Sequence, residues 1–100
     1  MRKISKLAIE AFMGGCDFKQ SNTTVLVFGN GNVQMFLHGH LIAEKHATAA
    51  GFIFRITNAG YFTNVTKERL NAIPGVSIHQ TKFQWYLNGK EWDGSWITID

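Results

Sequence analysis

A chain of 100 residues with 45% hydrophobic and 17% charged residues has the size and composition of one folded domain. This composition excludes an intrinsically disordered chain, which is poorer in apolar residues and richer in charge. The ten Lys and Arg residues outnumber the seven Asp and Glu residues, so the net charge is +3. Such a charge favours an anionic partner, but the basic residues lack the clustering of a dedicated DNA-binding protein. We therefore expect a single domain over residues 1–100.

The cysteine usage and the hydropathy of the chain bear on its compartment. Cys16 is the single cysteine, so no internal disulfide is possible and nothing indicates an oxidising environment. The basic start resembles the beginning of a secretory signal, but Lys6 and Glu10 interrupt the apolar run that such a signal needs. No uncharged stretch approaches the roughly 18 residues that cross a bilayer. We expect a cytoplasmic protein that does not associate with membranes.

The first predicted element is a helix near the start of the chain. Apolar residues there recur at the spacing of one helical face: Ile4, Leu7, Ala8, Ala11 and Phe12. Gly14 and Gly15 end this helix, because glycine readily adopts the left-handed geometry of a C-terminal cap. A polar connector is expected over residues 17–22.

From Thr24 the apolar period changes to two, which is the period of β-strands. Strands at 25–28 and 33–38 are predicted to form a hairpin around Gly29-Asn30-Gly31-Asn32, whose residues tolerate positive φ. This segment contains a G-x-G pattern, but a phosphate-binding loop must lead into a helix, so we favour the hairpin. Gly39 breaks the second strand, and residues 41–45 form either its continuation or a third strand.

Residues 47–51 are expected to form a loop, followed by a strand at 52–57. In that strand Phe52, Phe54 and Ile56 are predicted to face inward and Arg55 outward.

A turn at 58–60 leads to a second short helix around 64–73. Thr63, Asn64 or Thr66 could cap the N-terminus of this helix, and Pro74-Gly75 stops it. Strands follow at 76–80, 82–87 and 96–99, with turns at Asn88-Gly89 and at 93–94. We therefore predict an α+β fold, with one antiparallel sheet of five to seven strands, an N-terminal helix and a second short helix.

Few residues suggest a catalytic or metal-binding role. His38 and His40 would share one face of a strand and could offer two metal ligands, but no spacing signature supplies a third. Cys16 could pair with a histidine as a nucleophile, although a lone thiol is more often an apolar filler. Glu91 and Asp93 suggest the paired carboxylates of glycoside hydrolysis, but they also suit a solvated turn. We expect no catalytic residue, no metal site and no cofactor.

Aromatic and basic residues cluster near the C-terminus: Lys82, Phe83, Trp85, Tyr86, Lys90, Trp92 and Trp96. The alternation of a strand places Phe83, Trp85 and Leu87 on one face. We expect this face to be part of the core.

The remaining rings, Tyr86, Trp92 and Trp96, are the candidates for contact with a protein partner. Aromatic residues interleaved with lysines also suit single-stranded nucleic acid, whose bases stack on rings while cations meet phosphates. The candidates for that role are Lys67, Arg69, Lys82 and Lys90. The helix that holds Lys67 and Arg69 resembles a recognition helix, but no helix precedes it directly, so a solvated helix face is the favoured interpretation.

Several segments in this order resemble a family of small tailed-bacteriophage proteins of unknown function. These segments are Ser21-Asn22-Thr23-Thr24-Val25, Leu37-His38-Gly39, Ala59-Gly60-Tyr61, Thr66-Lys67-Glu68-Arg69-Leu70-Asn71 and Tyr86-Leu87-Asn88-Gly89-Lys90-Glu91-Trp92-Asp93-Gly94-Ser95-Trp96. Asparagine often follows Leu-His-Gly in that family where this chain has His40, which weakens a metal role for His40. The resemblance implies a phage gene product in the bacterial cytoplasm and carries over no functional residue.

Three functions follow as hypotheses. The first is a non-enzymatic accessory module that binds a host or phage protein. The second is binding of single-stranded or duplex nucleic acid through a basic and aromatic surface. The third is an uncharacterised small enzyme, which a cleft with converging titratable groups would indicate. Edge strands and surplus aromatics also suit a homodimer.

Overall fold

The computed structural model describes residues 3–99, which form two helices and two antiparallel sheets. In chain order the elements are α1 (Lys3–Gly14), β1 (Phe18–Gln20), β2 (Thr23–Val27), β3 (Val33–Leu37), β4 (His40–Thr48), β5 (Gly51–Ile56), α2 (Asn64–Asn71), β6 (Ile78–Thr81), β7 (Gln84–Leu87), β8 (Lys90–Glu91) and β9 (Ile97–Ile99). The predicted α+β class, with its N-terminal helix and second short helix, is confirmed.

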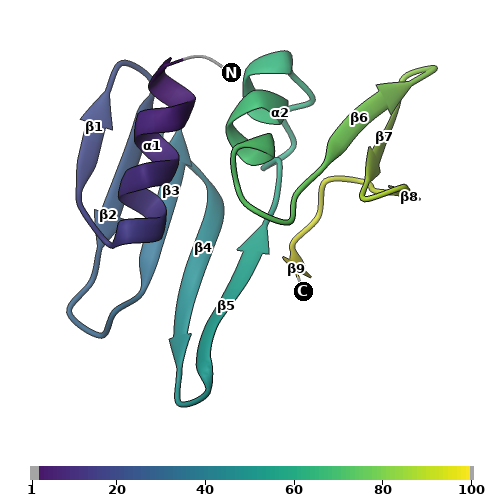
Figure 1. Cartoon of the computed structure of the whole chain (residues 1–100). Coiled ribbons are helices and arrows are strands. Elements are labelled where there is room, and N and C mark those ends of the chain that lie inside the picture. Colours follow the sequence, from purple (N-terminus) through teal and green to yellow (C-terminus); the bar gives the residue numbers. More distant parts are fainter. Residues whose placement is uncertain (1–2, 100) are drawn as a thin grey trace.

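The larger sheet has six strands in the order β1-β2-β3-β4-β5-β9. Its first five strands are joined in sequence by turns, whereas β9 returns from the end of the chain to pair with β5. The smaller sheet, β6-β7-β8, lies on the far side of α2 from α1 (Figure 1). The sequence predicted a single sheet, and the separation of β6 and β7 from it is a difference that strand periodicity cannot reveal.

One part of the core lies between α1 and a face of the larger sheet (Figure 1), and the same cluster continues to α2 and the smaller sheet with Leu70, Trp85 and Leu87. Ala8 and Phe12 are fully buried there, because they share the apolar face of the helix that the spacing predicted. They pack against the alternating inward residues of β2 and β3, among them Val25 and Met35. Burial of a ring such as Phe12 contributes about 1.5–3 kcal/mol relative to its exposure.

The predicted β2–β3 hairpin is confirmed, and of the two alternatives for residues 41–45 the structure has the third strand. β2 pairs with β3 across the Gly- and Asn-rich turn, in which Asn30 Oδ1 accepts a hydrogen bond of 3.0 Å from Asn32 N. β3 and β4 are separate strands joined by His38 and Gly39, which both have positive φ, at 53° and 81°. His38 therefore lies in a turn and does not share a strand face with His40, so the expected placement of the two imidazoles was wrong.

Three local predictions were wrong. Part of the expected connector forms the short edge strand β1, which pairs with β2. The loop expected at 47–51 is shorter in the structure and forms a turn, because β4 continues to Thr48 and β5 begins at Gly51. Phe52 is exposed although it was predicted to face the core, because the β4–β5 hairpin extends beyond the end of α1 (Figure 1). Lys45 Nζ lies 4.2 Å from the centroid of the Phe52 ring and covers part of it.

Thr63 caps α2, as the sequence allowed, since its hydroxyl accepts a hydrogen bond of 3.2 Å from Thr66 N. After the helix, the Asn71 side chain accepts from Ile78 N at 2.6 Å and donates to Ile78 O at 3.0 Å. The Asn88 side chain likewise accepts from Ser77 N at 2.8 Å. The two asparagines thus hold the start of β6 between α2 and the β7–β8 turn.

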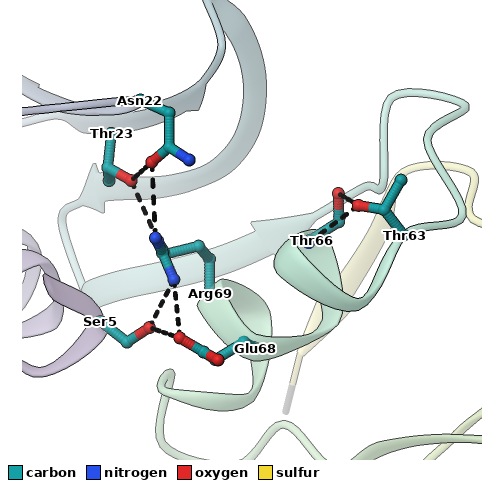
Figure 2. Close-up of polar contacts among 7 residues, drawn as sticks. All are labelled: Ser5, Asn22, Thr23, Thr63, Thr66, Glu68 and Arg69. Carbon is teal, nitrogen blue, oxygen red and sulfur yellow. Dashed lines mark hydrogen bonds and ion pairs between the residues drawn. The ribbon is translucent and has the colours of Figure 1, made fainter. Parts of the chain in front are cut away.

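Arg69 joins α1, β2 and α2 from the interior of the protein (Figure 2). Its guanidinium donates to Thr23 Oγ1 at 3.0 Å through Nε, and to Ser5 Oγ at 2.8 Å through Nη1. Nη1 also pairs with Glu68 Oε1 at 2.9 Å, and Ser5 Oγ donates to the same carboxylate oxygen at 2.8 Å. A buried charge needs such partners, and here they come from three elements.

Candidate binding surface

The tip of the β6–β7 hairpin carries the most exposed aromatic ring among the described residues. The hairpin turns over Lys82 and Phe83, which both have positive φ, at 50° and 70°. Phe83 is 96% exposed, whereas Trp85 and Leu87 are buried as predicted. The prediction that Phe83 is part of the core was wrong, because the strand alternation begins only after the turn, at Gln84.

This turn is unfavourable for the residues that form it. A two-residue hairpin turn with both φ values positive strongly prefers Asn-Gly. A side chain in left-handed geometry costs about 1–2 kcal/mol per residue, because its Cβ approaches a carbonyl oxygen. Phe83 also keeps its ring in water. Local strain of this kind clusters at functional sites, where the surrounding structure maintains it.

A second pair of exposed rings, Tyr61 and Phe62, lies in the loop between β5 and α2. The Phe62 ring packs edge-on against Trp85 of β7, with centroids 5.1 Å apart. Lys67 of α2 places its Nζ 5.7 Å from the Trp85 ring and donates to Gln80 of β6 at 3.1 Å. Trp85 therefore connects this loop, α2 and the hairpin.

A cavity of about 240 Å³ lies beside Tyr61. It lies between the β3–β4 turn, the loop after β5 and the start of α2, and it is lined by Leu37, His38, His40, Ile42, Asn58, Tyr61, Thr63, Val65 and Thr66. The buried residues among them form its floor, and the exposed His38, His40 and Tyr61 form its mouth. Tyr61 Oη and His40 Nε2 are hydrogen-bonded at 2.9 Å, with their rings 4.6 Å apart.

Asn58 is the polar residue of the cavity floor and is only 1% exposed. Its Oδ1 accepts a hydrogen bond of 2.8 Å from Gly60 N, which fixes the orientation of the amide. Within residues 3–99, its Nδ2 has no hydrogen-bond partner and is buried. A buried donor without a partner costs free energy.

The three rings predicted to contact a protein differ in exposure. Tyr86 is half-buried and stacks on His79, with centroids 5.2 Å apart. Trp92 is only 5% exposed and its Nε1 donates to Ser95 O at 2.9 Å, so the expectation that it faces solvent was wrong. Trp96 is exposed, with the Arg55 guanidinium 5.3 Å from its ring centroid.

The four predicted basic contacts are also separated. Lys82 is exposed at the hairpin tip, and Lys67 is half-buried against Trp85 and Gln80. Lys90 is exposed in β8, beside a second cavity of about 380 Å³. Arg69 is 2% exposed, so the interpretation as a solvated or phosphate-contacting residue was wrong. Its hydrogen bonds to Ser5 and Thr23, far away in the sequence, draw it into the interior.

Sequence reasoning missed Phe83, Tyr61, Phe62 and the cavity. A turn at Lys82-Phe83 lacks the Gly, Asn or Pro that marks turns in sequence. The cavity combines residues from 37 to 66, and the sequence gives no local signal for it. Within residues 3–99, no group of three or more His, Cys, Asp or Glu could hold a metal ion. None of the helices described over that range has the length and apolarity needed to cross a membrane.

The architecture defines a small α+β protein with two helices, two antiparallel sheets and exposed rings on its loops. The chain belongs to the Kyanoviridae Gp96 protein family, whose family model matches residues 1–99. It is thus a phage protein, and the resemblance to small tailed-phage proteins is confirmed. No curated protein and no solved structure matches the chain.

Proposed function

We propose that this phage protein is a non-enzymatic accessory module that binds a host or phage protein in the cytoplasm of the infected cell. The observation that carries the proposal is Phe83, a ring that is 96% exposed on a turn whose geometry disfavours it. The exposed ring adds no buried apolar area to the fold, and the left-handed geometry of the turn costs free energy. A partner that buries this ring would supply the missing stabilisation, since aromatic anchors dominate the energy of protein interfaces.

The surroundings of Phe83 support the same role. Phe62 rests against Trp85, which the hairpin holds in the interior, so the loop and the hairpin present their rings from a fixed base. Rigid presentation lowers the entropy that binding must overcome. Phe62, which is exposed as well, supplies further apolar area beside the hairpin.

Binding of nucleic acid has less support. Of its four candidate residues, Arg69 is buried and paired, and Lys67 is already bonded to Gln80. The two exposed lysines, Lys82 and Lys90, lie at the β6–β7 turn and in β8, at different ends of β7. A tract of phosphates needs several cations along one path.

The test is affinity capture from phage-infected host lysate after nuclease treatment. The wild-type chain is compared with a double variant, Lys82→Asn with Phe83→Gly, which keeps the turn and removes the ring. We expect a specific protein to be recovered with wild type and lost, or reduced at least 10-fold, with the variant, since an anchor residue contributes about 2 kcal/mol or more.

The matched control is Phe28→Ser, which removes another exposed ring from the β2–β3 turn, at the opposite end of the molecule (Figure 1). This variant should recover the same protein as wild type. Equal recovery with the double variant would contradict the proposal. Recovery that nuclease treatment abolishes would instead indicate a nucleic-acid partner.

A further inference from the structure

The face of the larger sheet that points away from α1 is open to solvent. Strand residues alternate between the two faces, and those on the α1 side, such as Val25, Met35 and Ala43, are buried. Of the residues that the strand register places on the other side, none is buried within the described part of the chain. We call this side the outer face, and its residues include Leu26, Phe36, Leu41, Glu44, Ile53 and Arg55.

Several residues of the outer face are apolar. An antiparallel sheet with one solvated face usually alternates hydrophobic inward residues with polar outward residues. Here Leu26 and Ile53 point outward and are 41% and 40% exposed, and Phe36 is partly exposed between them. Trp96, which precedes β9, lies on the same side, because the guanidinium of the outward Arg55 is 5.3 Å from its ring centroid. Exposed apolar area of this kind marks interaction surfaces.

Two opposite charges on the outer face determine which partner fits. Glu44 of β4 lies directly opposite Arg55 of β5 in the register of the sheet. Among residues 3–99, neither of them takes part in a salt bridge. Each charge is therefore available to an opposite charge from outside the chain. A surface that carries one charge of each sign side by side is complementary to a copy of itself turned by a two-fold axis.

A two-fold axis along the strands, between β4 and β5, would place two outer faces against each other. β4 of one copy then lies over β5 of the other, so that each Glu44 faces an Arg55. In the same arrangement β3 lies over β9, which brings Phe36 of one copy to Trp96 of the other. We infer that the outer face binds a second copy of this chain, in a symmetric dimer with two Glu44–Arg55 pairs among apolar contacts.

The first measurement is the mass of the full-length chain by sedimentation equilibrium over a range of concentrations. We expect a reversible dimer with twice the 11.3 kDa of one chain. Its dissociation constant should be on the order of 10 µM, at the weak end of specific interfaces. The double variant Lys82→Asn with Phe83→Gly should dimerise like wild type, since both residues lie in the β6–β7 hairpin of the smaller sheet. The dimer and the proposed binding by Phe83 can thus fail separately.

Charge reversal tests the two-fold arrangement. Glu44→Arg alone places two positive charges at each contact, and Arg55→Glu alone places two negative charges there, so each variant should dimerise at least 10-fold more weakly. An equal mixture of the two variants should regain the affinity of wild type, because each chain then meets the opposite charge on its partner. Mixing changes nothing inside either chain, so the recovery reports the contact between copies.

Glu10→Arg and Lys6→Glu are the matched controls, because they change the net charge by the same amounts. Both residues are exposed on α1, which covers the other face of the sheet (Figure 1). Each control should dimerise like wild type. Circular dichroism verifies that all four variants are folded, since like charges directly opposite each other in a sheet cost at most about 1 kcal/mol.

Three results would each overturn the inference. The wild-type chain could remain a monomer well above the expected dissociation constant, the single variants could dimerise as tightly as wild type, or the mixture could associate no better than its components. If wild type were a monomer and Glu44→Arg lowered the recovery of a captured protein, the outer face would bind that protein and not a second copy.

Discussion

Arg69 places a full positive charge in the interior, where its cost is offset by hydrogen bonds to three different elements. Ser5 from α1 and Thr23 from β2 accept from the guanidinium, and the neighbouring Glu68 neutralises it (Figure 2). The planar, forked donors of arginine suit this arrangement, which lysine could not reproduce. The residue therefore sets the angle at which α2 docks beside α1.

Replacement of Arg69 by alanine should lower the free energy of unfolding by about 3–5 kcal/mol, because the change leaves buried polar partners without their donor. The measurement is urea denaturation followed by circular dichroism. Arg55→Ala is the control, since Arg55 is exposed with its guanidinium 5.3 Å from the Trp96 ring centroid, and it should cost at most about 1 kcal/mol. Similar losses for the two variants would show that the interior network contributes little.

Phe83 is also in surroundings that do not suit its side chain, because its apolar ring is exposed and its backbone is left-handed. The double variant Lys82→Asn with Phe83→Gly should raise the free energy of unfolding by about 1–2 kcal/mol, because it relieves two left-handed residues. Thermal unfolding with and without a captured partner separates folding from binding. A gain in stability together with a loss of binding is the result expected of a functional residue. A less stable variant would mean that Phe83 supports the hairpin.

At the level of elements, the sequence predicts what local chemistry determines. The alternation Val33-Gln34-Met35 and the Asn88-Gly89 turn, with φ of 52° and 85°, each appear as predicted. The turn at Lys82-Phe83 cannot be predicted from the sequence, because neither residue is a turn former. The burial of Arg69 depends on Ser5 and Thr23, which no helical periodicity relates to it. The cavity likewise depends on how α2 meets the β3–β4 turn, which is a long-range outcome.

The cap of α2 offers a test at this level. Thr63→Ala removes the hydroxyl that accepts from Thr66 N and should lower the free energy of unfolding by about 1 kcal/mol. Thr63→Ser keeps that acceptor and should behave like wild type. Both are compared by chemical denaturation. If alanine were as stable as serine, the first turn of α2 would be held by packing alone.

For the whole molecule, the decisive contact is the one that joins the chain after β5 to the loop between β8 and β9. Gly94 O accepts from Thr57 Oγ1 at 2.5 Å and from Asn58 N at 3.0 Å. Hydrogen bonds from Ser95 to the Asp93 carboxylate hold the loop in shape and lower the pKa of Asp93. From this loop the chain enters β9 and completes the larger sheet. This close approach of backbone therefore ties the chain after β5 of the larger sheet to the loop that follows the smaller sheet.

Gly94→Ala should disrupt this link. A Cβ at this position would overlap the Asn58 side-chain amide, and the φ of +88° strains any side chain. We expect a loss of about 2–5 kcal/mol, the sum of left-handed strain and overpacking against a buried amide. Gly89→Ala isolates the strain of the left-handed backbone, because Gly89 has a φ of +85° and, its chain neighbours apart, no atom of the described residues lies within 4 Å of a Cβ placed there. The difference between the two variants in urea denaturation therefore measures the close approach alone.

The same pair of variants can be compared by NMR. Since Asn58 also lines the cavity, Gly94→Ala should shift the side-chain amide signals of Asn58 even in the folded protein, whereas Gly89→Ala should leave them in place. Equal stability losses with unchanged Asn58 signals would mean that the two sheets are held together elsewhere.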